Sequence, residues 1–196
     1  PDDIGVSAPI ALKQIDEVAH TVTLLARNLA TDPQIMRQIG SNCAFPGSHA
    51  RVAMVDSKGN HWTATFSDPS NLVDHALLEY ACTRLAAQCD IDTLPVKLES
   101  TPSCSVLLSG RADRIGSAPL HYISARSVLN QMEQTQSSNG FDDPAGYPAL
   151  ALFIRTHVRA WQEYNEQLFR TLVFNILIGN TNDNALHHGF IYSNKE

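Results

Sequence analysis

The sequence predicts a mixed α+β fold, in which a small part containing β-strands precedes a mostly helical part. Most short segments of strand-forming residues lie in the first 110 residues or so, although 189–192 is also typical of a strand. The part beyond about residue 147 consists mainly of longer segments with helical apolar spacing. With 196 residues, 43% of them hydrophobic, the chain is long enough to bury one sizeable core or two small ones.

The first half alternates helices with strand pairs. Apolar residues recur at every third or fourth position over 11–30, which predicts an amphipathic helix. Residues 51–55 and 62–66 are typical of strands, and the segment between them has the Asp, Gly and Asn content of a hairpin turn. A second helix is predicted over about 71–89, followed by two short strands over 94–100 and 104–109.

The second half is predicted to be helical. Residues 134–147 are rich in Gln, Ser, Asn, Gly and Pro, which indicates an exposed loop. One helix is expected to carry Leu150 through Trp161. Another carries Leu168 through Leu177, and its apolar positions extend so far round the helix that it should be nearly buried.

Composition excludes several classes of protein. Asp and Glu outnumber Lys and Arg by 20 to 14, and the resulting net charge of −6 disfavours direct binding to nucleic acid. No apolar run reaches the roughly 20 residues of a membrane span. The four cysteines form no C-x-x-C pair, so they are predicted to be reduced thiols, and the first residues lack a secretory signal. We therefore expect a cytoplasmic protein.

The length of the chain and the missing initiator Met suggest that it is part of a longer protein.

Several motifs together resemble the HipA family of kinase-like toxins. They occur in the family's order over roughly 12–193, at Gly40-Ser41, 62–66, 78–82, 111–114, 120–124 and 173–181. The resemblance implies a two-lobed, protein-kinase-like fold that binds ATP and magnesium and phosphorylates a protein of the translation machinery. It also implies a helix-turn-helix antitoxin as partner. The small lobe would be 1–117, and 118–196 would begin the helical lobe and end at a catalytic-loop-like segment.

The residues expected to hold the nucleotide depart from the family's pattern. Where the family has a phosphate-binding lysine, this chain has Thr65, whose neutral hydroxyl cannot replace the charge. Glu79 stands where the lysine's ion-pair partner would be. Ser41 and Asn42 begin an eroded glycine-rich loop, which lacks the adjacent glycines that let backbone N–H groups approach phosphate.

The resemblance places the hinge between the lobes at three residues, through which backbone contacts to a nucleotide would survive: Gly110, Arg111 and Ala112. Arg111 and Arg114 flank Asp113, and this spacing predicts a structural ion pair.

The catalytic positions are altered as well. The family's catalytic aspartate corresponds to Asn182, and the metal-binding asparagine five positions later corresponds to His187. An amide cannot accept a proton as a carboxylate does, and imidazole is a poorer magnesium ligand than an oxygen donor. Asp183 would fill the catalytic role if the loop slipped by one residue, but its own fifth neighbour is His188, so the metal position would stay unfilled.

Three functions remain open from the sequence. The first is a HipA-like pseudokinase or kinase-fold fragment that acts by binding a protein, without a firmly assigned cofactor. The second is an active serine/threonine kinase toxin, using ATP and magnesium on a protein substrate, in an altered or truncated chain. The third is a scaffold subunit that binds no nucleotide. The altered positions favour the first.

Overall fold

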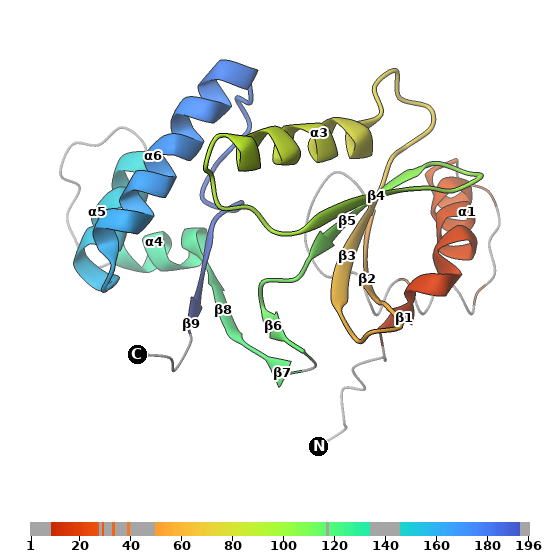
Figure 1. Ribbon diagram of the computed structural model, residues 1–196, viewed down its shortest axis with the longest axis horizontal. Coiled ribbons are helices and arrows are strands. Elements are labelled where there is room, and N and C mark those ends of the chain that lie inside the picture. The colour runs from red at the N-terminus through yellow and green to blue at the C-terminus, as the bar shows by residue number, and fades with distance from the viewer. Residues whose placement is uncertain are drawn as a thin grey trace. The chain divides into compact units, whose positions relative to one another are not determined.

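The structure is a computed structural model that describes residues 9–27, 29, 33, 39, 50–116, 118–133 and 146–192. Its helices and strands confirm the predicted α+β class (Figure 1). The contacts divide the chain into two compact units. Unit 1 comprises Pro1–Leu85 and Thr93–Ala118, and unit 2 comprises Ala86–Asp92 and Pro119–Glu196.

Unit 1 is built on a five-stranded sheet with the order β1-β2-β3-β5-β4. The strands are β1 (Ile10–Ala11), β2 (Arg51–Val55), β3 (His61–Phe66), β4 (Val96–Ser100) and β5 (Ser105–Gly110). β1 is parallel to β2, and the other neighbours are antiparallel. All four strands predicted in this part of the chain are confirmed within two residues of their predicted starts.

The β2–β3 hairpin is fixed by Asp56. Its carboxylate accepts hydrogen bonds from the backbone N–H of Lys58 and Asn60, from Asn60 Nδ2 at 2.9 Å and from Trp62 Nε1 at 3.1 Å. The side-chain hydrogen bond from Asn60 is the main cause that holds the pKa of Asp56 below its ordinary value. Gly59 supplies the left-handed conformation of the turn, with φ of 81°. These contacts set the register in which β2 faces β3.

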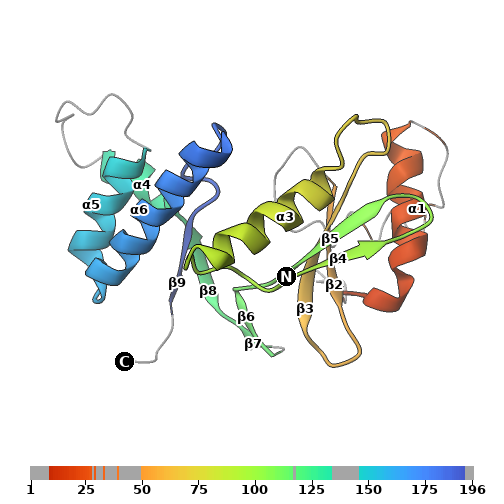
Figure 2. The ribbon, with the colours of Figure 1, turned by 45° about the horizontal axis from the view of Figure 1, so that its top comes forward.

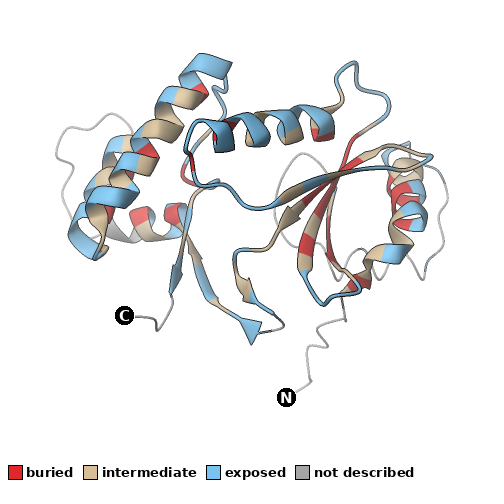
Figure 3. Ribbon diagram, in the orientation of Figure 1, coloured by how far each residue is buried: buried red, intermediate tan, exposed pale blue. Residues whose placement is uncertain are grey.

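One face of this sheet packs against α1 (Ile15–Ala26), which follows the short 3-10 helix η1 (Leu12–Gln14). The predicted first helix is therefore confirmed, with bounds shorter than 11–30. From α1 this core contains Val18, Ala19 and Val22; from the strands it contains Ile10, Val52, Met54, Trp62, Ala64, Phe66, Val106 and Leu108. Figure 3 shows the buried residues of unit 1 concentrated on these strands and on α1.

The helix α3 (His75–Gln88) lies on the side of the sheet opposite α1, as Figures 1 and 2 both show. Asp74 caps its start, because Asp74 Oδ1 accepts a hydrogen bond from the backbone N–H of Leu77. The helix itself was predicted, but its large apolar side chains are not the ones that are buried. Leu77 and Leu85 are exposed, and only Ala76 and Ala86 are buried.

Unit 2 contains three helices and a two-stranded sheet within its described residues. The elements are β8 (His121–Ser124), α4 (Ala125–Glu133), α5 (Tyr147–His157), α6 (Trp161–Ile178) and β9 (Gly189–Tyr192). β8 pairs with β9 in antiparallel fashion. A small separate pair is formed by β6 (Arg114–Ile115) and β7 (Ala118–Pro119). The core of unit 2 is made by Ala125, Leu129, Leu150, Ile154, Leu168 and Ala185.

Two predictions about the helices of unit 2 were wrong. The helix expected to carry Leu150 through Trp161 ends at His157, and Trp161 starts α6. α6 was expected to be nearly buried, but only Leu168 and Asn175 are buried in it, while Ile176 and Leu177 are 69% and 79% exposed. In the described ranges, no helix combines the length and apolar character needed to cross a bilayer.

Most of the predicted exposed loop at 134–147 lies outside the described residues, but its last residue, Tyr147, is the first residue of α5. This placement matters because Tyr147 belongs to the site described next.

Candidate functional site

The segment 180–188, between α6 and β9, carries the predicted catalytic positions and is called here the catalytic-position loop. It begins where Gly179 ends α6 in a left-handed conformation, with φ of 72°. The backbone N–H of Asn180 then bonds to the carbonyl of Asn175 at 2.8 Å. The left-handed conformation of Gly179 thus ends the helix and lets the start of the loop bond back to the last turns of α6.

Asp183 is the centre of this loop. Its Oδ2 accepts hydrogen bonds from Tyr147 Oη, from Asn175 Nδ2 at 2.9 Å and from His188 Nε2 at 3.0 Å. Its Oδ1 faces His187 Nδ1 at 3.2 Å. The side chain is only 11% exposed. A carboxylate has about four lone-pair positions, and four protein donors are directed at this one.

The electrostatics of Asp183 and Tyr147 follow from these contacts. Burial alone would raise the pKa of Asp183, but the hydrogen bonds from His188 and Tyr147 outweigh burial and lower the pKa to about 2. Burial raises the pKa of Tyr147 to about 12, and the hydrogen bond to the Asp183 carboxylate acts in the same direction. The aspartate is therefore ionised and the tyrosine protonated at neutral pH.

Asn182 and His187 lie in the same loop but are more exposed. Backbone groups of Asn182 are held locally: its N–H donates to Asn180 Oδ1 at 3.3 Å, and its carbonyl accepts from Asn184 Nδ2 at 3.1 Å. The side chain of His187 is 49% exposed, and its contact within the site is the one between its Nδ1 and Asp183 Oδ1. The structure therefore brings all three predicted catalytic and metal positions together in one loop of unit 2.

Thr65, which was predicted to stand in place of the family's lysine, lies in unit 1. It is buried in β3, where it stands directly opposite Arg51 of β2 on one side and Leu107 of β5 on the other. Glu79 is exposed on α3, and its side chain forms no ion pair within the described part of the chain.

The predicted hinge residues follow the same sheet. Gly110 ends β5, and its N–H donates to the carbonyl of Pro95 at 2.8 Å. Arg111 binds the Asp113 carboxylate through Nε at 2.8 Å and Nη2 at 2.5 Å, and Arg114 lies 3.5 Å from the same carboxylate. The hydrogen bond from Arg111 is the main cause of the lowered pKa of Asp113. The predicted ion pair is confirmed, and Ala112 lies within this turn.

Ser41 and Asn42, predicted for the phosphate-binding loop, lie outside the described residues. Three other residues of the sites were missed by the sequence reasoning. Tyr147 was assigned to a loop, Asn175 was noticed only as part of a motif, and Arg51 was noticed only as the start of a strand. For Arg51 a signal existed, since the register of a tight hairpin places it opposite Thr65.

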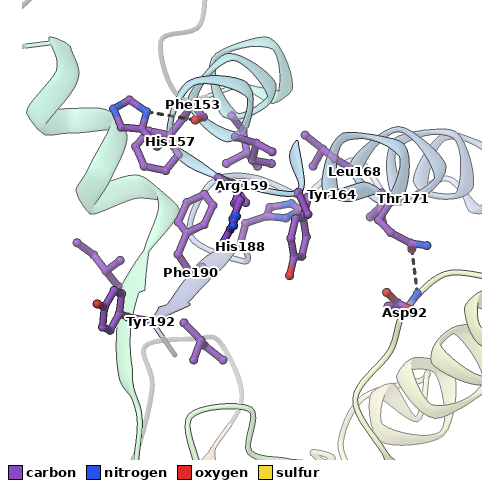
Figure 4. A pocket seen from close by; sticks show the side chains of 18 of the residues that line it. Asp92, Phe153, His157, Arg159, Tyr164, Leu168, Thr171, His188, Phe190 and Tyr192 are labelled. Atoms are coloured by element: carbon purple, nitrogen blue, oxygen red, sulfur yellow. Dashed lines mark hydrogen bonds between the residues drawn. The ribbon is translucent and has the colours of Figure 1, made fainter. Parts of the chain in front are cut away.

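An open hollow in unit 2 lies beside this loop and has a mixed lining of aromatic, aliphatic and polar side chains (Figure 4). His157 stacks on Phe153 with ring centroids 4.4 Å apart, and Phe153 packs against Phe190 at 4.8 Å. Of the Asp183 network only His188 lines the hollow. The hollow is thus a feature distinct from the predicted catalytic positions.

Comparison with protein families identifies the chain. The model of the HipA-like C-terminal domain matches residues 38–196, and the chain therefore belongs to this family. Among solved structures, it is similar to a chain of the complex of HipA, HipB and operator DNA from the Shewanella oneidensis MR-1 toxin–antitoxin system. The identity is 13% and the TM-score 0.58, over 78% of this chain and 41% of that chain. This likeness shows the fold, and the present chain spans less than half of its structural relative. No curated protein matches the chain significantly.

The residues at the predicted metal position do not fit magnesium. The carboxylate of Asp183 is occupied by protein donors, and His187 offers a nitrogen where magnesium prefers oxygen. Within the described ranges, no group of three or more His, Cys, Asp or Glu side chains is arranged to hold a metal ion.

Proposed function

We propose that this chain is a pseudokinase of the HipA-like family, which acts by binding a protein partner and transfers little or no phosphate. In this proposal the fold is the family's two-lobed kinase fold, with 1–117 as the small lobe and 118–196 as the start of the helical lobe.

The environment of Asp183 is the observation that carries the proposal. It is the only carboxylate in the catalytic-position loop, so it is the only residue there that could take the role of the family's catalytic aspartate. Four protein donors already occupy its two oxygens. A substrate hydroxyl would have to displace one of them. This geometry supports a structural role for Asp183 and argues against its taking the catalytic role through a slip of the loop by one residue.

Two further positions support the same conclusion. Thr65 brings no charge to the phosphates, and Asn182 brings an amide to the position of the base. The loss of one preorganised electrostatic group typically slows an enzyme by about 100-fold or more. Several such losses in one chain leave a reaction too slow for a turnover-based function.

The test is phosphoryl transfer by the purified chain. With ATP labelled at the γ-phosphate and magnesium, we expect no labelled protein, either on the chain itself or on a generic serine-containing substrate. An active HipA-family kinase assayed in parallel shows that the conditions permit transfer. Label on the unaltered chain that disappears in Asp183→Asn would establish the active-kinase alternative instead.

The proposed partner is a small helix-turn-helix protein of the antitoxin type. The structural relative was solved together with HipB and operator DNA, which supports this choice. The net charge of −6 argues that contact with DNA would be made by the partner. We expect no DNA retardation by the chain alone at physiological salt, and retention of a small helix-turn-helix protein in a pull-down from the chain's native cell. Salt-sensitive DNA binding by the chain alone would contradict this part of the proposal, and a pull-down that recovers no such protein would favour the scaffold alternative.

A further inference from the structure

Arg51 is the first residue of β2, and its position is set by the hairpin register. β2 and β3 pair so that Arg51 lies directly opposite Thr65. Directly opposed residues of an antiparallel pair point to the same face of the sheet. The adjoining pair, Val52 and Ala64, belongs to the core beneath α1. Arg51 and Thr65 therefore share the other face.

The guanidinium of Arg51 has no hydrogen-bond or ion-pair partner among the residues that the structure describes. Its Nε is buried and makes no hydrogen bond, and no ion pair of Arg51 occurs within the described residues. A buried donor on a charged group is costly to leave unsatisfied. A protein that keeps such a group usually has a ligand or partner for it.

The described neighbours on this face do not supply the missing acceptor. Thr65 is followed across the sheet by Leu107 and Leu98, which are apolar. The carboxylate of Asp74, at the start of α3, is held by Ser67 Oγ at 2.5 Å and by the N–H of Leu77 at 3.1 Å. The strands of this face thus present one unpaired arginine, without a carboxylate to neutralise it.

We propose that Arg51 and Thr65 form a binding site for a phosphate group, in which Arg51 supplies the positive charge that the altered position 65 lacks. A guanidinium has five N–H donors in a planar fork that matches the oxygens of phosphate. The Thr65 hydroxyl, which makes no hydrogen bond in the described structure, adds a neutral donor directly across from it. The phosphate is either free or carried by a nucleotide. The site lies within unit 1, so its failure would leave the proposed lack of phosphoryl transfer untouched.

The experiment monitors the Arg51 Nε–H signal by NMR while phosphate-bearing ligands are added without divalent metal. The three ligands are inorganic phosphate, ATP and adenosine. We expect the Arg51 signal to shift with inorganic phosphate and with ATP, and not with adenosine. Saturation by ATP at concentrations at least about tenfold lower than by phosphate identifies the nucleotide as the source, and equal concentrations identify free phosphate.

Matched variants test whether Arg51 carries the binding. We expect Arg51→Gln to raise the Kd for phosphate or ATP by about tenfold or more, since it removes a charge-assisted bidentate contact. Arg51→Lys should lose less, because it keeps the charge. Lys97→Gln is the control: Lys97 lies in the same sheet but packs its ammonium 4.4 Å from the ring centroid of Trp62, on the α1 face.

Trp62 fluorescence and far-UV circular dichroism verify that each variant is folded. If Arg51→Gln is not folded, Arg51→Lys and the Nε–H shift of the unaltered protein still decide. An Arg51 signal that none of the ligands moves, or equal losses in Arg51→Gln and Lys97→Gln, would overturn the proposal.

Discussion

Acid should unfold unit 2 in a way that reports directly on Asp183. The pKa of this carboxyl is lowered from 3.8 to about 2 in the folded protein. A group with a depressed folded pKa stabilises the protein above its unfolded pKa, and this contribution is lost as the pH falls through the folded value. The stabilisation from Asp183 is therefore complete above about pH 4 and declines toward pH 2.

The magnitude follows from the size of the shift. One pKa unit corresponds to about 1.4 kcal/mol, so a fall from 3.8 to about 2 corresponds to roughly 2.5 kcal/mol of unfolding free energy. The side chain is only 11% exposed, so solvent screens this contribution little. For a small unit, this is a large fraction of the total stability.

The assay is urea unfolding at a series of pH values, followed by the fluorescence of Trp161 in a Trp62→Phe background. Trp161 packs against the core of unit 2, so its signal isolates this unit from the carboxylates of unit 1. The same series on Asp183→Asn gives the part of the pH dependence that belongs to Asp183. The carboxyl carbon of Asp183, titrated by NMR, gives the pKa independently if that variant does not fold. A measured pKa of about 3.5 or above would refute the reasoning, because the four hydrogen bonds would then not favour the ionised form.

Three further outcomes test the packing around the two sites. Thr65→Lys places a second cation directly opposite Arg51; at about 8 Å and an effective dielectric constant of about 20, the repulsion is about 2 kcal/mol. A double-mutant cycle with Arg51→Ala measures the interaction energy between the two cations and should return most of this repulsion. An interaction energy below about 0.5 kcal/mol would contradict the prediction. Tyr147→Phe removes one donor from Asp183 and should cost about 1–2 kcal/mol in urea unfolding while raising the pKa of Asp183; an unchanged pKa would exclude the contact. Gly189→Ala would drive a methyl group into the ring of Tyr122 and should destabilise unit 2 by about 1–3 kcal/mol, with partial relief from Tyr122→Ala; equal losses with and without that ring would argue against the clash.

The elements that local sequence determines could be predicted. β2 and β3 were found within one residue because alternation and the Asp-Gly-Asn turn are local signals. The break between α5 and α6 had no such signal, because residues 158–160 contain neither glycine nor proline. The exposure of α6 was also missed. Its apolar residues extend round the helix, but its described packing within unit 2 is mainly with α5, which leaves Ile176 and Leu177 uncovered.

The candidate site could be located from the sequence only in part. Asn182, Asp183 and His187 are close in the chain, so a motif was enough to bring them together. The contact from Tyr147 to Asp183 joins residues 36 positions apart and depends on where α5 begins. No spacing rule predicts such a contact. The saturation of the carboxylate, on which the proposed function depends, was for that reason visible only in three dimensions.

The register between Arg51 and Thr65 also links the charges that these two positions can carry. A lysine at position 65 beside Arg51 would place two cations on one face of the sheet. Replacing Arg51 alone would leave the strands of that face without either cation. An engineered chain that carries a lysine at position 65 therefore needs both positions changed together.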